Sequence, residues 1–383
     1  MSRTVCKNVG GYDANSNHPS AGRLPPVVYF PLVEGVRSRV VAAGGLRQHV
    51  YESGQPGAEP VVLIHGNAAS ARFYEHTLAR LGERFYCVAP DLRGYGASEA
   101  RPVDATRGLR DFADDVAALT HSLGLEQFHL VGWSLGGNIA MQFTIDHPQR
   151  VRTLLLESAG SPFGYGATHG ADGAVNIADY AGSGAGLINP TLIELLKAKD
   201  TTADSPFSAR SAMRHLYVKE GFTYDPRWED ALVEQMLLMQ IGEQYYPGDS
   251  VPSPNWPYTA PGVYGANNAL SPKYGNLLAL ADITPKPPIL WAHGADDIVV
   301  SDQAMVDPGM LGKLGLIPGW PGDEVYPPQP MVTQLRMLLD RYAANGGSYR
   351  EEVIPDCGHS PHIEYPDMFV TLAQSLITGA QAR

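Results

Sequence analysis

Short apolar runs alternate with stretches of helical periodicity along most of the chain. Strands buried in a sheet are expected at 60–66, 84–91, 128–134, 151–159 and 287–294, with a last strand at 348–355. Helices are expected near 71–81, at 109–124 and 135–147, and after the last strand. Strands that alternate with helices predict an α/β fold, with a mostly parallel central sheet covered by helices on both faces.

Two segments interrupt this alternation. Residues 161–283 begin with glycines, end with prolines and hold helical candidates at 190–199 and 229–242. A stretch this long is unusual as a bare loop, so we expect a mainly helical cap inserted into a core formed by 36–160 and 284–383. The Gly- and Pro-rich residues 301–330 are expected to form an ordered surface excursion.

The amino-terminal part of the chain has its own pattern. Residues 1–35 begin with a stretch rich in Gly, Asn and Pro and are expected to form a surface arm. Residues 36–43 and 46–53 are expected to pair as two strands, with Gly44 and Gly45 as the turn between them.

The segment LVGWSLGGNIA places Ser134 where an expected strand meets an expected helix with no loop between them. Gly132 and Gly136 flank this serine, and Gly137 follows. A turn this sharp strains the serine backbone, and glycines remove the side chains that would collide there. The pattern G-x-S-x-G in a strand–turn–helix context is the nucleophile elbow, so it predicts Ser134 as a nucleophile.

A serine hydroxyl needs a general base, and the base needs an acid that orients it. In a nucleophile-elbow enzyme the chain order is serine, then aspartate or glutamate, then histidine. Asp296 and Asp297 follow the expected strand at 287–294, and His359 and His362 follow the last expected strand. These four residues are therefore the first candidates for the acid and the base.

Several motifs in order resemble the α/β-hydrolase superfamily, in its AB hydrolase-1 type with a serine nucleophile and an inserted cap domain. They are HGN (65–67), DLRGYGAS (91–98), GWSLGGN, HGADDIVV and CGHSPHIE, and they span 36–160 and 284–383. The resemblance implies that Asp297, at the G-x-x-D spacing from Gly294, is the acid and that His359 of G-H-S is the base. The backbone N–H groups of Asn67 and Leu135 are the expected oxyanion-hole donors.

Two other carboxylates stay open as the acid. Glu157 ends the expected strand at 151–159, and together with HGN it resembles the dehalogenase branch, which can place its acid there. That branch uses an aspartate nucleophile, so Ser134 disfavours dehalogenation and epoxide opening. Asp296 would replace Asp297 after a one-residue loop shift, and otherwise we expect it to cap the loop.

The remaining reactive side chains have structural expectations. We expect His362 at the surface or behind the site, His65 bracing its loop and Cys357 packed as a small residue. A metal pair of His359 and His362 lacks further ligands, so no metal and no cofactor are expected.

Charge and composition exclude several partners. The formal net charge is -12 and no Lys/Arg run is present, which argues against nucleic acids and anionic membranes. Three cysteines at long spacing predict no disulfide framework. The N-terminus lacks the apolar core of a signal peptide and no apolar run is long enough to span a membrane, so a cytoplasmic protein is expected.

Serine, histidine and an oxyanion hole perform acyl transfer. The sequence therefore predicts hydrolysis of a carboxylic ester or lactone of a small apolar or aromatic molecule through an acyl-Ser134 intermediate. A thioesterase, amidase or peptidase, C–C hydrolase or acyltransferase would use the same residues. A slow-turnover ligand-binding receptor on this fold is the alternative from another class, and association as a homodimer stays open.

Overall fold

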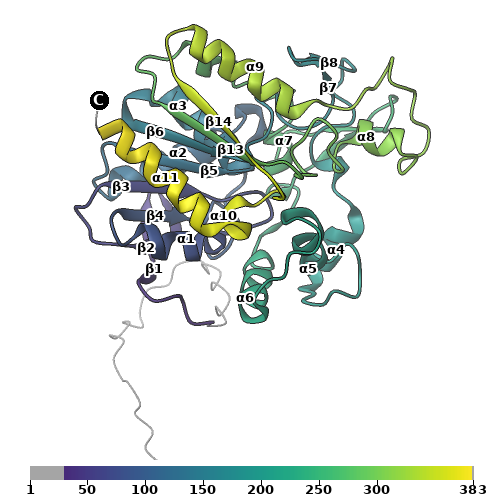
Figure 1. Cartoon of the computed structure of the whole chain (residues 1–383). Coiled ribbons are helices and arrows are strands. Elements are labelled where there is room, and N and C mark those ends of the chain that lie inside the picture. Colours follow the sequence, from purple (N-terminus) through teal and green to yellow (C-terminus); the bar gives the residue numbers. More distant parts are fainter. Residues whose placement is uncertain (1–29, 382–383) are drawn as a thin grey trace, which may run out of the picture.

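A central sheet of eight strands dominates the computed structural model, which describes residues 30–381 (Figure 1). The strand order is β1-β2-β4-β3-β5-β6-β13-β14, and β1 and β2 pair antiparallel with their neighbours while the other pairs are parallel. The strands are β1 (Val36–Ala43), β2 (Leu46–Ser53), β3 (Pro60–Ile64), β4 (Tyr86–Pro90), β5 (Phe128–Trp133), β6 (Val151–Glu157), β13 (Ile289–Gly294) and β14 (Tyr349–Ile354). The predicted α/β fold is confirmed.

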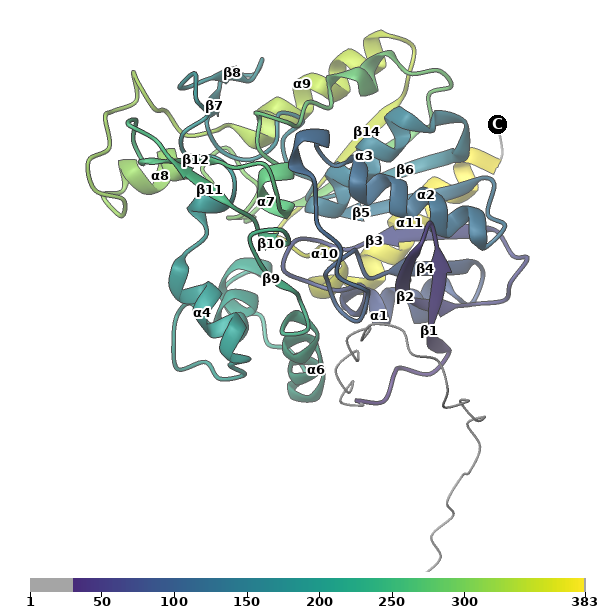
Figure 2. The ribbon, with the colours of Figure 1, turned by 180° about the vertical axis from the view of Figure 1, so that it is seen from behind.

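Helices cover both faces of this sheet, as the front and back views show (Figures 1 and 2). On one face α1 (Glu75–Leu81) packs against α11 (Pro366–Gln381), and on the other α2 (Arg110–Ser122) packs against α3 (Leu135–Asp146). The core segments 36–160 and 284–383 also hold α8 (Pro308–Lys313), α9 (Met331–Ala344), the single turn α10 (Pro361–Glu364) and short 3₁₀ turns at Ala71–Tyr74, Ala105–Arg107 and Pro148–Arg150.

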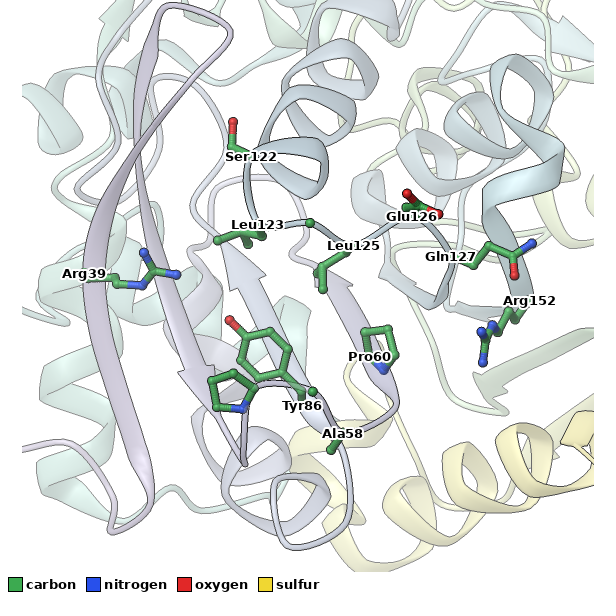
Figure 3. A pocket seen from close by; sticks show the side chains of 13 residues that line it. Arg39, Ala58, Pro60, Tyr86, Ser122, Leu123, Leu125, Glu126, Gln127 and Arg152 are labelled. Atoms are coloured by element: carbon green, nitrogen blue, oxygen red, sulfur yellow. The ribbon is translucent and has the colours of Figure 1, made fainter.

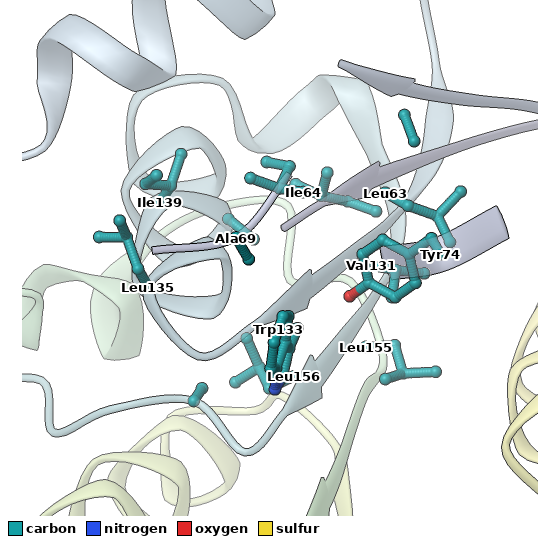
Figure 4. Close-up of a cluster of buried hydrophobic side chains, with 14 of the residues drawn as sticks. Leu63, Ile64, Ala69, Tyr74, Val131, Trp133, Leu135, Ile139, Leu155 and Leu156 are labelled. Carbon is teal, nitrogen blue, oxygen red and sulfur yellow. The ribbon is translucent and has the colours of Figure 1, made fainter. Parts of the chain in front are cut away.

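The core lies where the middle strands meet these helices (Figure 4). The apolar runs of β3, β5 and β6 are buried on both faces, with Leu63, Val131 and Leu155 at most 2% exposed. Burial of an aliphatic side chain of this size stabilises the fold by roughly 1.5–3 kcal/mol. Continuous apolar runs therefore predicted these strands to within two residues at each end, because both faces of each strand have to be apolar.

Residues 161–283, called the insertion below, hold both helices and short strands. The helices are α4 (Pro190–Ala198), α5 (Ala209–Ala212), a π-helical turn (Met213–Tyr217), α6 (Pro226–Met236) and α7 (Ala266–Ala269), with 3₁₀ turns at Ala185–Leu187 and Leu278–Asp282. Three two-stranded pairs join β7 (Thr168–His169) with β8 (Ala174–Val175), β9 (Ile241–Gly242) with β10 (Tyr246–Pro247), and β11 (Ser250–Pro252) with β12 (Thr259–Pro261). The pairs were not predicted, because strands of two or three residues show no alternation.

The expected helices at 190–199 and 229–242 correspond to α4 and α6. Each begins at a proline that follows a capping side chain: Asn189 accepts from Thr191 N–H, and Asp225 accepts from Arg227 N–H. Such capping satisfies one of the free N–H groups of the first turn. The helix α6 starts three residues before the expected stretch, because its cap lies outside the apolar pattern.

The segment 301–330 lies largely at the surface, as expected, but it also packs on the insertion. It contains α8 (Pro308–Lys313), and Tyr326 is fully buried against Trp256 of the insertion with ring centroids 4.8 Å apart. The Tyr326 hydroxyl hydrogen-bonds to the backbone carbonyls of Ala181 and Gly182, at 3.0 and 2.9 Å. The sequence did not predict these contacts, because the apolar partners of the segment lie in a distant part of the chain.

Most of the expected amino-terminal arm, residues 1–29, lies outside the described residues. Where the description begins, the carbonyl of Phe30 accepts from Arg72 and the N–H of Val33 donates to Glu75. Within residues 30–381, no helix combines the length and the apolar content that crossing a membrane requires.

Candidate active site

Ser134 sits in the predicted sharp turn between β5 and α3, with φ 55° and ψ -121°. A Cβ on Gly132 would lie 2.3 Å from the carbonyl oxygen of Gly136, and one on Gly136 would lie 2.1 Å from the oxygen of Ile64. A Cβ on Gly137 would lie 2.5 Å from the Cβ of Ala159. Backbone and core occupy these positions, so only glycine fits, and the strained serine is held by its packed surroundings.

His359 and Asp297 form a buried pair at the carboxyl ends of β14 and β13. The His359 Nδ1 lies 2.8 Å from Asp297 Oδ2, and the residues are 2% and 5% exposed. The other carboxylate oxygen, Oδ1, accepts from the N–H groups of Val299 and Val300 at 2.8 and 2.9 Å. Because the carboxylate is held from both sides, it fixes the imidazole with Nδ1 as the donor, and Nε2 is left as the proton acceptor.

Asp296 points to a different partner. Its carboxylate lies 2.9 Å from the ammonium group of Lys219 in the insertion, and its side chain is 48% exposed. The role of loop cap that was expected for Asp296 belongs to Asp297, whose Oδ1 receives two backbone N–H groups of the same loop.

Glu157 does not contact His359 but pairs with His362. Glu157 Oε1 lies 2.7 Å from His362 Nδ1 and accepts the His362 backbone N–H at 2.8 Å. The hydroxyl of Tyr74 lies 3.2 Å from Oε2, and burial raises the pKa of this tyrosine well above its usual value, so it stays a donor. Both oxygens of Glu157 are therefore engaged away from His359, and His362 is buried behind the site rather than at the surface.

The two expected oxyanion donors come from segments that touch. A Cβ on Gly136 would lie 2.6 Å from the His65 carbonyl oxygen, so the start of α3 packs directly on the loop that holds Asn67. Leu135 is the first residue of α3, and such an N–H has no partner inside its own helix. Within the described residues, no backbone carbonyl accepts the N–H of Asn67.

The alpha/beta hydrolase family model matches residues 61–372 of this sequence. The chain belongs to the alpha/beta hydrolase family. The match includes the elbow around Ser134 and three loops. These are the oxyanion loop after β3, which holds Asn67, the acid loop after β13, which holds Asp296 and Asp297, and the histidine loop after β14, which holds His359.

The similarity to sequence relatives covers only about a third of this alpha/beta hydrolase. It is 36% identical over 129 residues to the 2-hydroxymuconate semialdehyde hydrolase of Pseudomonas sp. (strain CF600), which covers 33% of this chain and 44% of the relative. It is 32% identical over 128 residues to the fluoroacetate dehalogenase of Burkholderia sp., covering 33% of this chain and 41% of the relative. The chain thus spans less than half the length of these curated relatives.

Solved structures share the fold over nearly the whole chain. A carboxylesterase from Bacillus subtilis superposes with a TM-score of 0.56 at 17% identity, covering 90% of this chain and 92% of the other. A thermophilic esterase from Thermogutta terrifontis gives 0.54 at 17% identity, covering 90% and 99%.

His65 has the bracing role that was expected. Its Nε2 accepts the Leu92 N–H at 3.0 Å and its Nδ1 lies 2.8 Å from the Gly66 carbonyl. Complete burial lowers the pKa of the imidazole, which keeps the ring neutral in this role. Cys357 is also buried, and burial raises the pKa of its thiol, which matches a packed residue.

Two residues that pack around the candidate site, Trp133 and Tyr217, were not predicted from the sequence. Trp133, the second residue of G-x-S-x-G, donates its indole N–H to the His359 carbonyl at 2.8 Å and packs on Gly66. Tyr217 of the insertion lies against Trp133, with ring centroids 5.6 Å apart, and reaches the carbonyls of Asn67 and Ala68. For Trp133, its position next to Ser134 was the only feature of the sequence that pointed to the site. Tyr217 lies in no motif, so the sequence did not point to it.

The pocket in Figure 3 lies elsewhere. It has a volume of about 710 Å³ and is lined around the amino ends of β3 and β4, by residues such as Pro60, Tyr86 and Leu125. Ser134 follows the carboxyl end of β5, where ligands bind in open α/β sheets, so this pocket is not the active site. Within residues 30–381, no three His, Cys, Asp or Glu side chains are grouped as metal ligands.

Proposed function

We propose that this alpha/beta hydrolase cleaves a carboxylic ester or lactone of a small apolar or aromatic molecule through an acyl-Ser134 intermediate. The observation that carries the proposal is the buried 2.8 Å contact between His359 and Asp297, on the loops that follow β14 and β13. Ser134 follows β5 of the same sheet and takes the backbone conformation of a nucleophile elbow.

Each proposed step uses a group in this arrangement. His359 Nε2 takes the proton of Ser134 Oγ as the oxygen attacks the ester carbonyl, and Asp297 stabilises the imidazolium that forms. The N–H groups of Leu135 and Asn67 stabilise the oxyanion. The imidazolium then protonates the leaving alkoxide, and water activated by His359 releases the acid from the acyl-enzyme.

Replacing the serine tests this mechanism. We expect Ser134→Ala to lower kcat on an aryl ester by at least about 10⁴-fold and to abolish labelling by a fluorophosphonate, because no other group forms the acyl bond. Ser122→Ala, at the exposed end of α2, is the matched control and should behave as wild type. Ester hydrolysis by Ser134→Ala at the wild-type rate would refute the acyl-serine mechanism.

Hydrolysis of a carbon–carbon bond is the second candidate. Two sequence relatives are named as hydrolases of compounds that are not esters. They are a 2-hydroxymuconate semialdehyde hydrolase and a 2-hydroxy-6-oxo-2,4-heptadienoate hydrolase. A panel of aryl esters, lactones, thioesters and hydroxy-oxo-dienoates would rank these activities. Labelling that traps one product without turnover would instead favour the receptor alternative.

A further inference from the structure

Three consecutive residues of the insertion contact the loops that hold the proposed active-site residues. Tyr217 ends the π-helical turn, Val218 is extended with φ -130° and ψ 160°, and Lys219 follows. Val218 is 2% exposed and Tyr217 is 8% exposed, so the segment is packed rather than free at the surface. We call residues 217–219 the strap.

The strap first contacts the loop that holds the expected oxyanion donor. The Tyr217 hydroxyl lies 3.1 Å from the Asn67 carbonyl oxygen and 2.9 Å from that of Ala68. Burial raises the pKa of Tyr217, so the hydroxyl keeps its proton and donates it. Ala68 has φ 46°, which is unfavourable for a residue with a Cβ and needs external support. Tyr217 supplies such support at the peptide next to the Asn67 N–H.

The strap next contacts the histidine loop. The Lys219 backbone N–H donates to Glu364 Oε2 at 2.9 Å, and the N–H of Gly358 donates to Oε1 of the same carboxylate at 2.9 Å. A Cβ on Gly358 would lie 2.5 Å from the Lys219 nitrogen and 2.8 Å from the Val218 carbonyl carbon. The residue directly before His359 is therefore in contact with the strap backbone.

The Lys219 side chain joins the histidine loop to the acid loop. Its ammonium group lies 2.9 Å from Asp296 and 2.7 Å from Asp356. Asp296 precedes Asp297, and Asp356 lies three residues before His359. Exposed ion pairs add little to the stability of the fold, so the relevance of Lys219 lies in the two loops that its ammonium group links. It connects the two loops that hold the Asp297–His359 pair.

We propose that Tyr217 and Lys219 are positioning residues, and that the insertion holds the oxyanion loop, the acid loop and the histidine loop in their reactive arrangement. This inference rests on the proposed serine mechanism. It assigns to the insertion a part in the chemical step that is independent of which substrate binds.

The test measures kcat and KM separately in the full chain. We expect Tyr217→Phe to lower kcat by about 10- to 100-fold with KM within about 3-fold of wild type, because a displaced oxyanion donor weakens binding of the transition state only. The rate of fluorophosphonate labelling should fall in parallel. Tyr258→Phe, at a 62% exposed tyrosine of the insertion, is the matched control and should leave both constants unchanged.

Lys219 provides a second and independent arm. We expect Lys219→Met to lower kcat by about 3- to 10-fold and Lys219→Arg to restore most of it, since arginine keeps the cation. Added salt should slow the wild type toward the rate of Lys219→Met but leave that variant nearly unaffected. Lys197→Met, at an exposed lysine of α4, is the control.

The outcomes separate this inference from the proposed function. A fall in kcat for both variants, with no change in the controls, supports the strap. An unchanged kcat in folded Tyr217→Phe and Lys219→Met, with Ser134→Ala inactive, overturns the strap and leaves the serine mechanism intact. A rise in KM alone would make Tyr217 a substrate contact and would also overturn the inference. If Tyr217→Phe does not fold, the Lys219 series decides.

Discussion

At the residue scale, the proposed site depends on which carboxylate meets which imidazole. Three acidic residues lie near two histidines, but each takes a different partner. Asp297 contacts His359 at 2.8 Å, Glu157 contacts His362 at 2.7 Å, and Asp296 pairs with a lysine. Of the three carboxylates, only that of Asp297 contacts His359, and its role as the acid stays a prediction.

The three acidic residues can be compared directly. We expect Asp297→Asn to lower kcat on an aryl ester by about 10⁴-fold, as for the equivalent change in a serine protease, because the amide no longer holds the reactive tautomer. Asp296→Asn and Glu157→Gln should each cost far less in kcat. Steady-state assays of the three variants on one ester give the ranking. If Glu157→Gln were the variant with the largest loss, Asp297 would be only an ordinary loop carboxylate.

At the element scale, helix starts depend on single capping side chains. The helices α4, α6 and α8 each have an acceptor side chain before a proline, and in α8 that side chain is Asp307, which accepts from Met310 N–H at 2.9 Å. Asp307 is 1% exposed, and burial raises its pKa to about 6. Because the folded state favours the protonated form of the Asp307 carboxyl, the stability of the fold should depend on pH at this residue.

Asparagine at position 307 should remove that sensitivity. Because the folded-state pKa of Asp307 lies above its usual value, its contribution to stability is present at low pH and is lost as pH rises through about 6. Asp307→Asn keeps an acceptor for Met310 but cannot ionise. We therefore compare the free energy of unfolding of the variant with that of wild type. The difference should change in favour of the variant by roughly 3 kcal/mol at most between pH 4 and pH 8.

Urea unfolding at a series of pH values measures this difference. Asp323→Asn, at an exposed carboxylate of the same segment, is the control and should follow the wild-type pH profile. Parallel profiles for wild type and Asp307→Asn would contradict the prediction.

At the scale of the whole molecule, the insertion and the sheet share one hydrophobic core. Leu232 and Met236 of α6 belong to the same buried cluster as Phe73 and Trp133. The segment 301–330, which leaves the sheet after β13, packs in turn on the insertion through Tyr326 and Trp256. Separation of the insertion from the sheet would expose apolar surface on both, so independent unfolding is disfavoured.

The two parts should therefore unfold together. We expect one cooperative transition in urea, in which peptides from α6 and peptides from β5 and β6 lose protection at the same urea concentration. Hydrogen exchange measured by mass spectrometry across the transition checks this. Loss of protection in α6 at a much lower urea concentration than in β5 would show that the insertion is a separate unit.

The sequence by itself determined the features that local patterns encode. Apolar runs located the strands because both faces of a buried parallel sheet must be apolar. The glycines around Ser134 located the turn because no residue with a Cβ fits beside it. The motifs also placed Asp297 and His359 at the ends of the right strands, although their catalytic roles stay predictions.

Only the tertiary structure decided how distant segments meet. Glu157 and His362 are 205 residues apart, and Tyr217 is 150 residues from Asn67, one of the two residues whose carbonyls it contacts. The packing of residues 301–330 on the insertion belongs to the same class. Such contacts leave no periodic pattern in the sequence, because each depends on the path of the backbone between its two partners.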